Sequence, residues 1–113
     1  MTSIVSKPWG SYEVLHTGDN YAIKKIIVKP GGILSLQSHK FRSEHWVVVK
    51  GVAEITINED VFERKENENI FIPLKAKHRL ANNQSLDLVV IELWFGDQLD
   101  EADIIRYEDI YNR

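Results

Sequence analysis

The chain of 113 residues contains no cysteine, which excludes disulfides, thiolate metal ligands and a cysteine nucleophile. It also lacks an excess of positive charge: the net charge is −3, which argues against nucleic acid or an anionic membrane surface as a partner. No apolar run is long enough to cross a bilayer, and the first residues lack the apolar segment of a secretory signal. We therefore expect a cytoplasmic protein.

The pattern of apolar residues predicts an all-β protein. A length of 113 residues, with 43% hydrophobic and 27% charged residues, is typical of one globular domain, here residues 1–113. Short apolar segments alternate with turns rich in Gly, Asn and Asp, which indicates a sandwich or barrel. The predicted strands are Ser11–Leu15, Tyr21–Val28, Ile33–Ser38, His45–Val49, Ala53–Ile57, Val61–Arg64, Asn69–Ile72, His78–Ala81 and Leu86–Phe95.

The end of the chain is the exception to this strand pattern. Residues 100–111 begin with acidic side chains, which favour the positive end of a helix, so we predict one helical turn there. Ile104, Tyr107 and Tyr111 would then share one face packed against the barrel.

Four side chains of the metal-ligand type form the most informative pattern: Gln37, His39, Glu44 and His78. Gln37 and His39 are two residues apart in a predicted strand and can therefore face one cavity. Glu44 can face it too if residues 40–43 form a corner that returns the chain on a neighbouring strand. Imidazole, carboxylate and amide ligands suit a borderline divalent metal, for which we expect zinc, with cobalt, manganese, nickel or iron as alternatives. The alternative to metal ligation is a polar pocket without metal.

Two predicted strands are apolar on both faces. They contain Ile26–Val28 and Val47–Val49. Strands buried on both sides need a second covering layer, and in so small a chain that layer is either the rest of the fold or another subunit. We predict a homodimer formed through the outer sheet.

The spacing of the ligand-type residues resembles the two motifs of the cupin superfamily. The first is Gly31-(x)5-Gln37-x-His39-(x)4-Glu44-(x)6-Gly51, with Gln37 in place of the first histidine. The second is Asn67-(x)5-Pro73-x-Lys75-(x)2-His78-(x)3-Asn82, in which Asn67 and Lys75 replace the two usual glycines. The resemblance implies a double-stranded β-helix, a jelly-roll barrel with its metal inside.

Within that superfamily, the chain is similar to the type II phosphomannose isomerase domain from Lys7 to its last residue. The similarity is carried by Lys7–Tyr12, Leu34–His39, Arg42–Val49 and Arg106–Tyr111. Such domains usually form the C-terminal part of enzymes that also carry mannose-1-phosphate guanylyltransferase activity. The resemblance implies a metal-dependent isomerase that interconverts mannose 6-phosphate and fructose 6-phosphate through an enediolate, for sugar-nucleotide supply. The chain has no glycine-rich phosphate loop, so we expect no guanylyl transfer from it alone.

Two residues are candidates for catalysis. Arg42, in the corner between two ligand strands, could bind phosphate or stabilise the enediolate, and a solvated arginine is the alternative. Lys24 is assigned a catalytic role because the family pattern has a lysine there. The base that moves the proton is left open among a metal-bound hydroxide, Lys24 and Glu92.

Three further residues are candidates for substrate binding: Ser35, Lys75 and Arg79. Ser35 is in register with Gln37, whereas surface or outer-face positions are the favoured alternatives for Lys75 and Arg79. The chain departs from the family pattern at Ile33 and Trp94. A sugar-binding cupin without turnover, a metal-dependent dioxygenase and an accessory subunit of a guanylyltransferase are rival functions.

Overall fold

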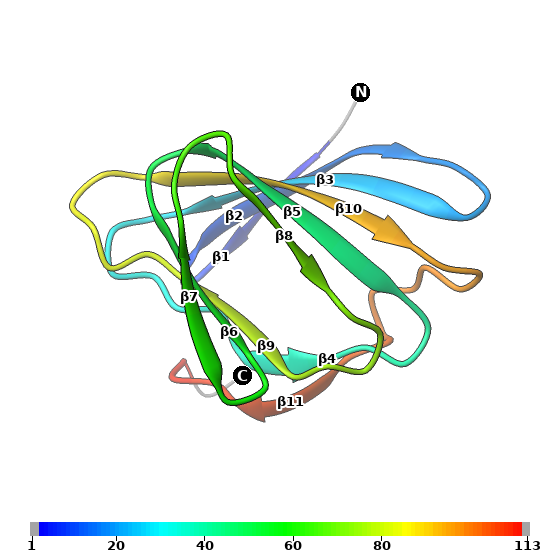
Figure 1. The fold of residues 1–113 in the computed structure, drawn as a ribbon. Helices are drawn as coiled ribbons and strands as arrows, with labels where there is room; N and C mark the ends of the chain where they lie inside the picture. Colours follow the sequence, from blue (N-terminus) through cyan, green and yellow to red (C-terminus); the bar gives the residue numbers. More distant parts are fainter. Residues whose placement is uncertain (1–2, 112–113) are drawn as a thin grey trace.

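The computed structural model describes residues 3–111, which form eleven β-strands and no helix (Figure 1). The strands are β1 (Ile4–Lys7), β2 (Gly10–Thr17), β3 (Tyr21–Val28), β4 (Leu36–Ser38), β5 (Ser43–Lys50), β6 (Ala53–Ile57), β7 (Asp60–Arg64), β8 (Asn69–Ile72), β9 (His78–Ala81), β10 (Leu88–Phe95) and β11 (Ile105–Glu108). One antiparallel sheet has the order β1-β2-β3-β10-β5-β8, and the other has the order β11-β4-β9-β6-β7. The two sheets face each other as a jelly-roll barrel. Within residues 3–111 there is no helix that could span a membrane.

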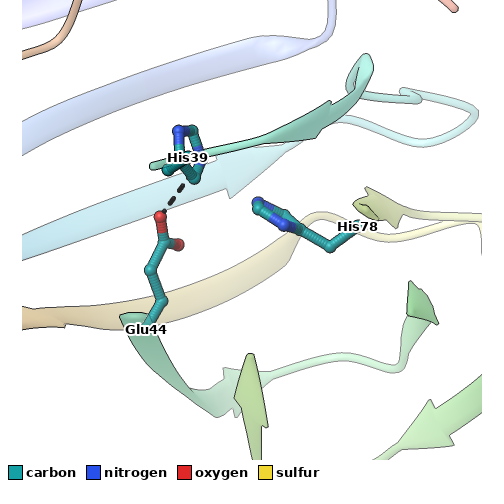
Figure 2. Close-up of side chains that lie close together, drawn as sticks. All are labelled: His39, Glu44 and His78. Carbon is teal, nitrogen blue, oxygen red and sulfur yellow. Dashed lines mark ion pairs between the residues drawn. The ribbon is translucent and has the colours of Figure 1, made fainter. Parts of the chain in front are cut away.

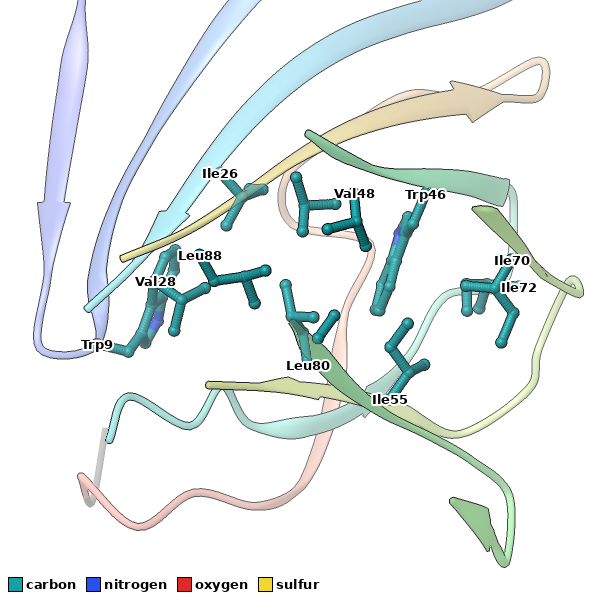
Figure 3. Packing of buried hydrophobic residues seen from close by; sticks show 12 residues of the cluster. Trp9, Ile26, Val28, Trp46, Val48, Ile55, Ile70, Ile72, Leu80 and Leu88 are labelled. Carbon is teal, nitrogen blue, oxygen red and sulfur yellow. The ribbon is translucent and has the colours of Figure 1, made fainter. Parts of the chain in front are cut away.

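The inward faces of the two sheets form the hydrophobic core (Figure 3). Along β3, β5 and β10 every second residue is buried, as strand geometry requires. Each fully buried aliphatic side chain contributes about 1.5–3 kcal/mol relative to exposure. The core residues are Trp9, Ile26, Val28, Trp46, Val48, Ala53, Ile55, Ile70, Ile72, Leu80, Leu88 and Val90.

The same alternation places polar side chains at the other end of the barrel. On the three central strands of the larger sheet, the inward positions are apolar except at Lys24, Glu44 and Glu92, which lie toward one end, with Ala22 and Trp94 beyond Lys24 and Glu92. The strand register brings these positions together, because Lys24 pairs with Glu92, and Glu92 pairs with Trp46. One end of the barrel is therefore a dry core and the other a buried polar site.

The predicted strands are present with shifted ends. The segment predicted at Ile33–Ser38 is shortened to β4, and Ile33 makes only an isolated bridge with Ala81. The short edge strands β1 and β11 were not predicted.

The helical turn predicted within residues 100–111 is wrong. The Asp100 carboxylate accepts a hydrogen bond from Ala102 N at 2.9 Å, and Asp103 N donates to Asp100 O at 2.9 Å, which closes a tight turn instead. Aspartate side chains compete in this way with helical hydrogen bonding. The backbone then continues as β11, which pairs with β4. Tyr111 packs against the core as predicted, whereas Tyr107 is 43% exposed.

Two residues take the left-handed backbone conformation at positions where the cupin motif usually has glycine. Asn67 has φ 71° and Lys75 has φ 67°. Glycine is common at such positions because it has no Cβ to clash with the backbone. The chain therefore keeps both turns, with some backbone strain at Lys75. Asn67 and Lys75 in place of glycine leave the barrel closed.

The outward face of the six-stranded sheet carries several exposed apolar side chains. They are Val47, Val49, Phe71, Leu93 and Phe95, each between 37% and 54% exposed. Leu93, His45 and Phe71 lie in one cross-strand row, and the rings of His45 and Phe71 are 4.7 Å apart. The second apolar face predicted for β5 is therefore present.

Candidate metal centre

Three ligand-type side chains meet inside the polar end of the barrel (Figure 2). His39 follows β4, Glu44 is the first inward residue of β5, and His78 begins β9. One ligand atom from each lies within 4.8 Å of the others, and all three side chains are buried. The corner after His39 differs from the prediction, because it leads to the opposite sheet rather than to a neighbouring strand. His39 and Glu44 therefore face each other across the cavity.

Hydrogen bonds set the tautomers of the two histidines. Nδ1 of His39 lies 2.6 Å from the carbonyl oxygen of Asp103, and Nδ1 of His78 lies 3.1 Å from that of Ala76. A carbonyl oxygen only accepts, so each Nδ1 carries the hydrogen and each Nε2 keeps its lone pair. Burial lowers the pKa of His39 to about 4 and also lowers that of His78. Both rings are neutral at neutral pH, as metal ligation requires.

Glu44 is ionised because Arg42 lies beside it. Arg42 Nε donates to Glu44 Oε2 at 2.8 Å, and Trp46 Nε1 donates to Oε1 at 2.7 Å. Burial by itself would raise the pKa of Glu44, but electrostatic interactions with His78, Arg42 and His39 and the hydrogen bond from Arg42 lower it to about 2. The site thus holds a carboxylate at all physiological pH values.

Arg42 lies inside the cavity rather than at a solvated corner, which excludes the solvated alternative. Its side chain is 5% exposed, and its guanidinium lies 3.4 Å from the centroid of the Trp94 ring. Nη2 is 3.2 Å from Nε2 of His39. Arg42 therefore contacts two of the three clustered side chains and fixes the orientation of Glu44.

Gln37 lines the same cavity and pairs in register with His78 between β4 and β9. Its amide nitrogen donates to Ser35 Oγ at 3.1 Å, so its oxygen is the atom that it can offer to a cation. Two neutral imidazoles, a carboxylate and an amide oxygen make a nitrogen and oxygen donor set that fits a borderline divalent ion. Residues His39, Glu44 and His78 could hold such an ion, and the ligand role of Gln37 stays a prediction.

The cavity has a volume of about 170 Å³. This is smaller than the roughly 300–1,000 Å³ of pockets for drug-sized ligands, so the cavity suits a small metabolite. Of the predicted site residues, Lys24, Ser35 and Arg42 line it together with the four ligand candidates. The remaining lining residues are Lys7, Trp9, Tyr12, Ile26, Leu34, Trp46, Leu80, Glu92, Trp94, Glu101, Ile104 and Arg106.

Two predicted substrate-binding residues are not brought to the cavity. Arg79 Nε donates to the carbonyl oxygen of Leu34 at 3.0 Å, and its guanidinium lies 3.6 Å from the carboxylate of Glu108. Alternation on β9 explains this, because buried His78 and half-buried Arg79 point to opposite faces. Lys75 is exposed on the loop before β9, and neither residue belongs to the cavity lining.

Glu92 is a buried carboxyl group beside the cluster. It accepts a hydrogen bond from Trp94 Nε1 at 3.0 Å. Burial and the negative charge of Glu44 raise its pKa to about 8, against the opposing effects of Lys24, the Trp94 hydrogen bond and Arg42. Glu92 therefore carries a proton at neutral pH, next to a carboxylate that does not.

Glu92→Gln is expected to flatten the pH dependence of folding stability in the presence of a chelator. The folded pKa of Glu92 is about 8, against a reference value of 4.5, so its contribution is fully present below pH 4.5 and is lost as the pH rises toward 8. At 1.36 kcal/mol per pH unit, the wild-type chain loses about 3 kcal/mol relative to Glu92→Gln between pH 4.5 and 7. Urea unfolding at several pH values measures the difference. A difference independent of pH, equal to that for the exposed control Glu63→Gln, would contradict it.

Several cavity residues were not singled out from the sequence. Lys7, Tyr12, Glu101 and Arg106 line the cavity, and the Asp103 carbonyl orients His39. Lys7, Tyr12 and Arg106 lie in the strings that carried the family resemblance, which was a usable signal. The sequence contains no such signal for Glu101 or Asp103, because their roles depend on contacts with residues more than 60 positions away.

The barrel and the buried histidine and carboxylate cluster define the class: the protein is a cupin. Solved structures agree. CapF from Staphylococcus aureus superposes with a TM-score of 0.80 at 22% identity, covering 96% of this chain and 35% of that one. The cupin domain of Cnp3 from Schizosaccharomyces pombe gives a TM-score of 0.74 at 15% identity, covering 77% and 64%. At these identities the likeness shows the fold.

Residues 1–109 match the family model "Mannose-6-phosphate isomerase C-terminal", and the chain belongs to that family. It is 49% identical over 109 residues to the alginate biosynthesis protein AlgA of Pseudomonas fluorescens, and equally to the mannose-1-phosphate guanylyltransferase ManC of Salmonella typhimurium. Each alignment covers 96% of this chain and 23% of the relative. The chain thus spans about a quarter of the length of these relatives and corresponds to their isomerase-type domain.

Proposed function

We propose that the protein is a metal-dependent aldose-ketose isomerase that interconverts mannose 6-phosphate and fructose 6-phosphate. The observation that carries the proposal is the buried cluster of His39, Glu44 and His78 in a small cavity lined by cationic side chains. The family match supports the choice of substrate.

The four ligand candidates would hold one divalent ion, zinc in our proposal. His39 and His78 offer Nε2, Glu44 offers a carboxylate oxygen, and Gln37 offers its amide oxygen. When bound, such an ion supplies Lewis acidity that polarises the sugar carbonyl and stabilises negative charge developing on oxygen. Cobalt, manganese, nickel and iron suit the same donor set.

The reaction also needs a group that carries a proton between two neighbouring carbons. Glu92 lies in the cavity, and its raised pKa of about 8 is close to the working pH, where proton transfer in both directions is efficient. We assign the proton transfer to Glu92, and we assign Arg42 the positioning of Glu44, because two of its nitrogens contact Glu44 and His39.

The direct test is to incubate the protein with fructose 6-phosphate and zinc, cobalt or manganese, and to follow mannose 6-phosphate by proton NMR. We expect turnover that disappears with a chelator and returns with added metal. Bound metal without turnover would overturn the isomerase in favour of a sugar-binding cupin, and oxygen uptake with ferrous iron would point to a dioxygenase.

We also propose that the protein is a homodimer formed through the outward face of the six-stranded sheet. Val47, Phe71, Leu93 and Phe95 are exposed there, and apolar patches of this kind mark protein interfaces. Light scattering at micromolar concentration should give twice the chain mass of 13.1 kDa. Phe71→Glu should give the single mass, and Val61→Glu on β7 should not. A single mass for the wild-type chain would refute the dimer.

A further inference from the structure

The cavity lining has an imbalance of charge. Its cations are Lys7, Lys24, Arg42 and Arg106, and its acids are Glu44, Glu92 and Glu101. Arg42 is paired with Glu44, so the lining holds three further cations against the carboxyl groups of Glu92 and Glu101. Such a cavity favours an anionic ligand.

Lys24 is the most deeply placed of those three cations. It is 7% exposed and points inward from β3. Its ammonium lies 3.9 Å from the ring centroid of Tyr12 and 4.4 Å from that of Trp94, so aromatic faces hold it on two sides. Lys7 lies 5.9 Å from the same Tyr12 ring, and Arg106 pairs in register with Gln37. The Lys24 ammonium is thus held in one position inside the cavity.

The partner of Lys24 in this structure is Glu101. Its carboxylate oxygens lie 2.8 and 3.3 Å from Nζ of Lys24, and its side chain is 52% exposed. The turn that carries Glu101 is held by other atoms, because the Asp103 carboxylate accepts hydrogen bonds from Lys40 N at 3.0 Å and Phe41 N at 2.9 Å. The Glu101 carboxylate can therefore leave Lys24 without loosening the turn.

The position of Lys24 suits one end of an elongated ligand. β10 lies between β3, which carries Lys24, and β5, which carries Glu44. At about 4.8 Å per strand, the two strands are roughly 10 Å apart. An open-chain hexose 6-phosphate has its reacting carbons and its phosphate at opposite ends, so its phosphate can reach Lys24 while its reacting carbons lie on the Glu44 side of Glu92, which pairs in register with Lys24.

We propose that Lys24, in a cavity also lined by Lys7 and Arg106, is the subsite for the phosphate group of the substrate, and that the Glu101 carboxylate occupies it until phosphate displaces it. The proposal rests on the function proposed above. Phosphate is the stronger ligand for the lysine, since it carries more charge than a carboxylate and has three strong acceptor oxygens. The Glu101 carboxylate therefore competes with the substrate phosphate for Lys24.

The test measures inorganic phosphate binding to metal-free protein by calorimetry at fixed ionic strength. Glu101→Gln should tighten binding roughly 2- to 5-fold, the range expected for removing one partly exposed ion pair. Lys24→Gln should weaken binding about 10-fold or more, because a charged hydrogen-bond donor is lost. The matched control Glu59→Gln removes an exposed acid outside the cavity lining and should have no effect.

The same variants, loaded with metal, should change KM for mannose 6-phosphate in the same directions. No phosphate binding by any variant, or equal affinities for wild type, Glu101→Gln and Glu59→Gln, would overturn the proposal. Because Glu101 is exposed, Glu101→Gln gives a result even if Lys24→Gln does not fold. If phosphate affinities follow the predicted order but the protein shows no isomerase turnover, the phosphate subsite is upheld and the proposed reaction is rejected. If the protein turns over but KM is unchanged in the variants, the reaction is upheld and the subsite is rejected.

Discussion

Glu44→Gln is expected to weaken zinc binding by about 100-fold or more and to abolish isomerisation. Glu44 is the anionic member of the His39, Glu44 and His78 cluster, and glutamine keeps its shape and one hydrogen-bond acceptor while losing the charge. Loss even of groups that only support a metal ligand typically costs 10- to 100-fold in affinity, so loss of a charged ligand should cost at least as much.

Competition with a chromophoric chelator measures the zinc affinity, and proton NMR measures turnover on the same samples. Glu63→Gln makes the same chemical change on exposed β7 and should bind zinc as the wild type does. The unfolding midpoint of Glu44→Gln must be recorded with a chelator present, so that loss of metal is separated from loss of fold. Wild-type zinc affinity in a folded Glu44→Gln protein would show that the metal, if any, binds elsewhere.

The strands that could be predicted from the sequence are those whose side chains alternate strictly. The inward positions of β3, β5 and β10 are apolar except for Lys24, Glu44 and Glu92, and this period of two indicates a strand whatever its partners. β1 and β11 are short edge strands whose existence depends on pairing with β2 and β4, and β11 has no buried residue at all. No local pattern marks such a segment.

The residues of the candidate site also divide into those that local spacing predicts and those whose place depends on the complete fold. The two-residue spacing of Gln37 and His39 placed both on the cavity, and the motif predicted that His78 would join them. The burial of Arg42 was not predictable from its place in a corner, because it depends on that corner crossing between the two sheets. The contact of Lys24 with Glu101 spans 77 residues and follows only from the complete barrel.

Arg42→Ala is expected to destabilise the metal-free protein by about 3–5 kcal/mol, because it leaves the buried Glu44 charge without its cationic partner. Zinc should restore much of this stability, since a divalent cation beside Glu44 replaces the missing charge and binds only the folded state. Urea unfolding with a chelator and then with zinc measures both effects. Arg64→Ala, which removes a surface arginine, should cost no more than about 1 kcal/mol.

The effect of Arg42→Ala should also depend on pH. In the wild type, the folded pKa of Glu44 is about 2, so its contribution to stability is present above pH 4.5 and is lost as the pH falls toward 2. Without Arg42, the pKa of Glu44 loses the lowering effects of the Arg42 charge and hydrogen bond and rises above its wild-type value, so protonation of Glu44 stabilises the variant as the pH falls. The stability difference between wild type and variant should therefore shrink below pH 4.5. A constant difference between pH 7 and pH 3 would mean that Arg42 acts through packing on Trp94 rather than through the charge of Glu44.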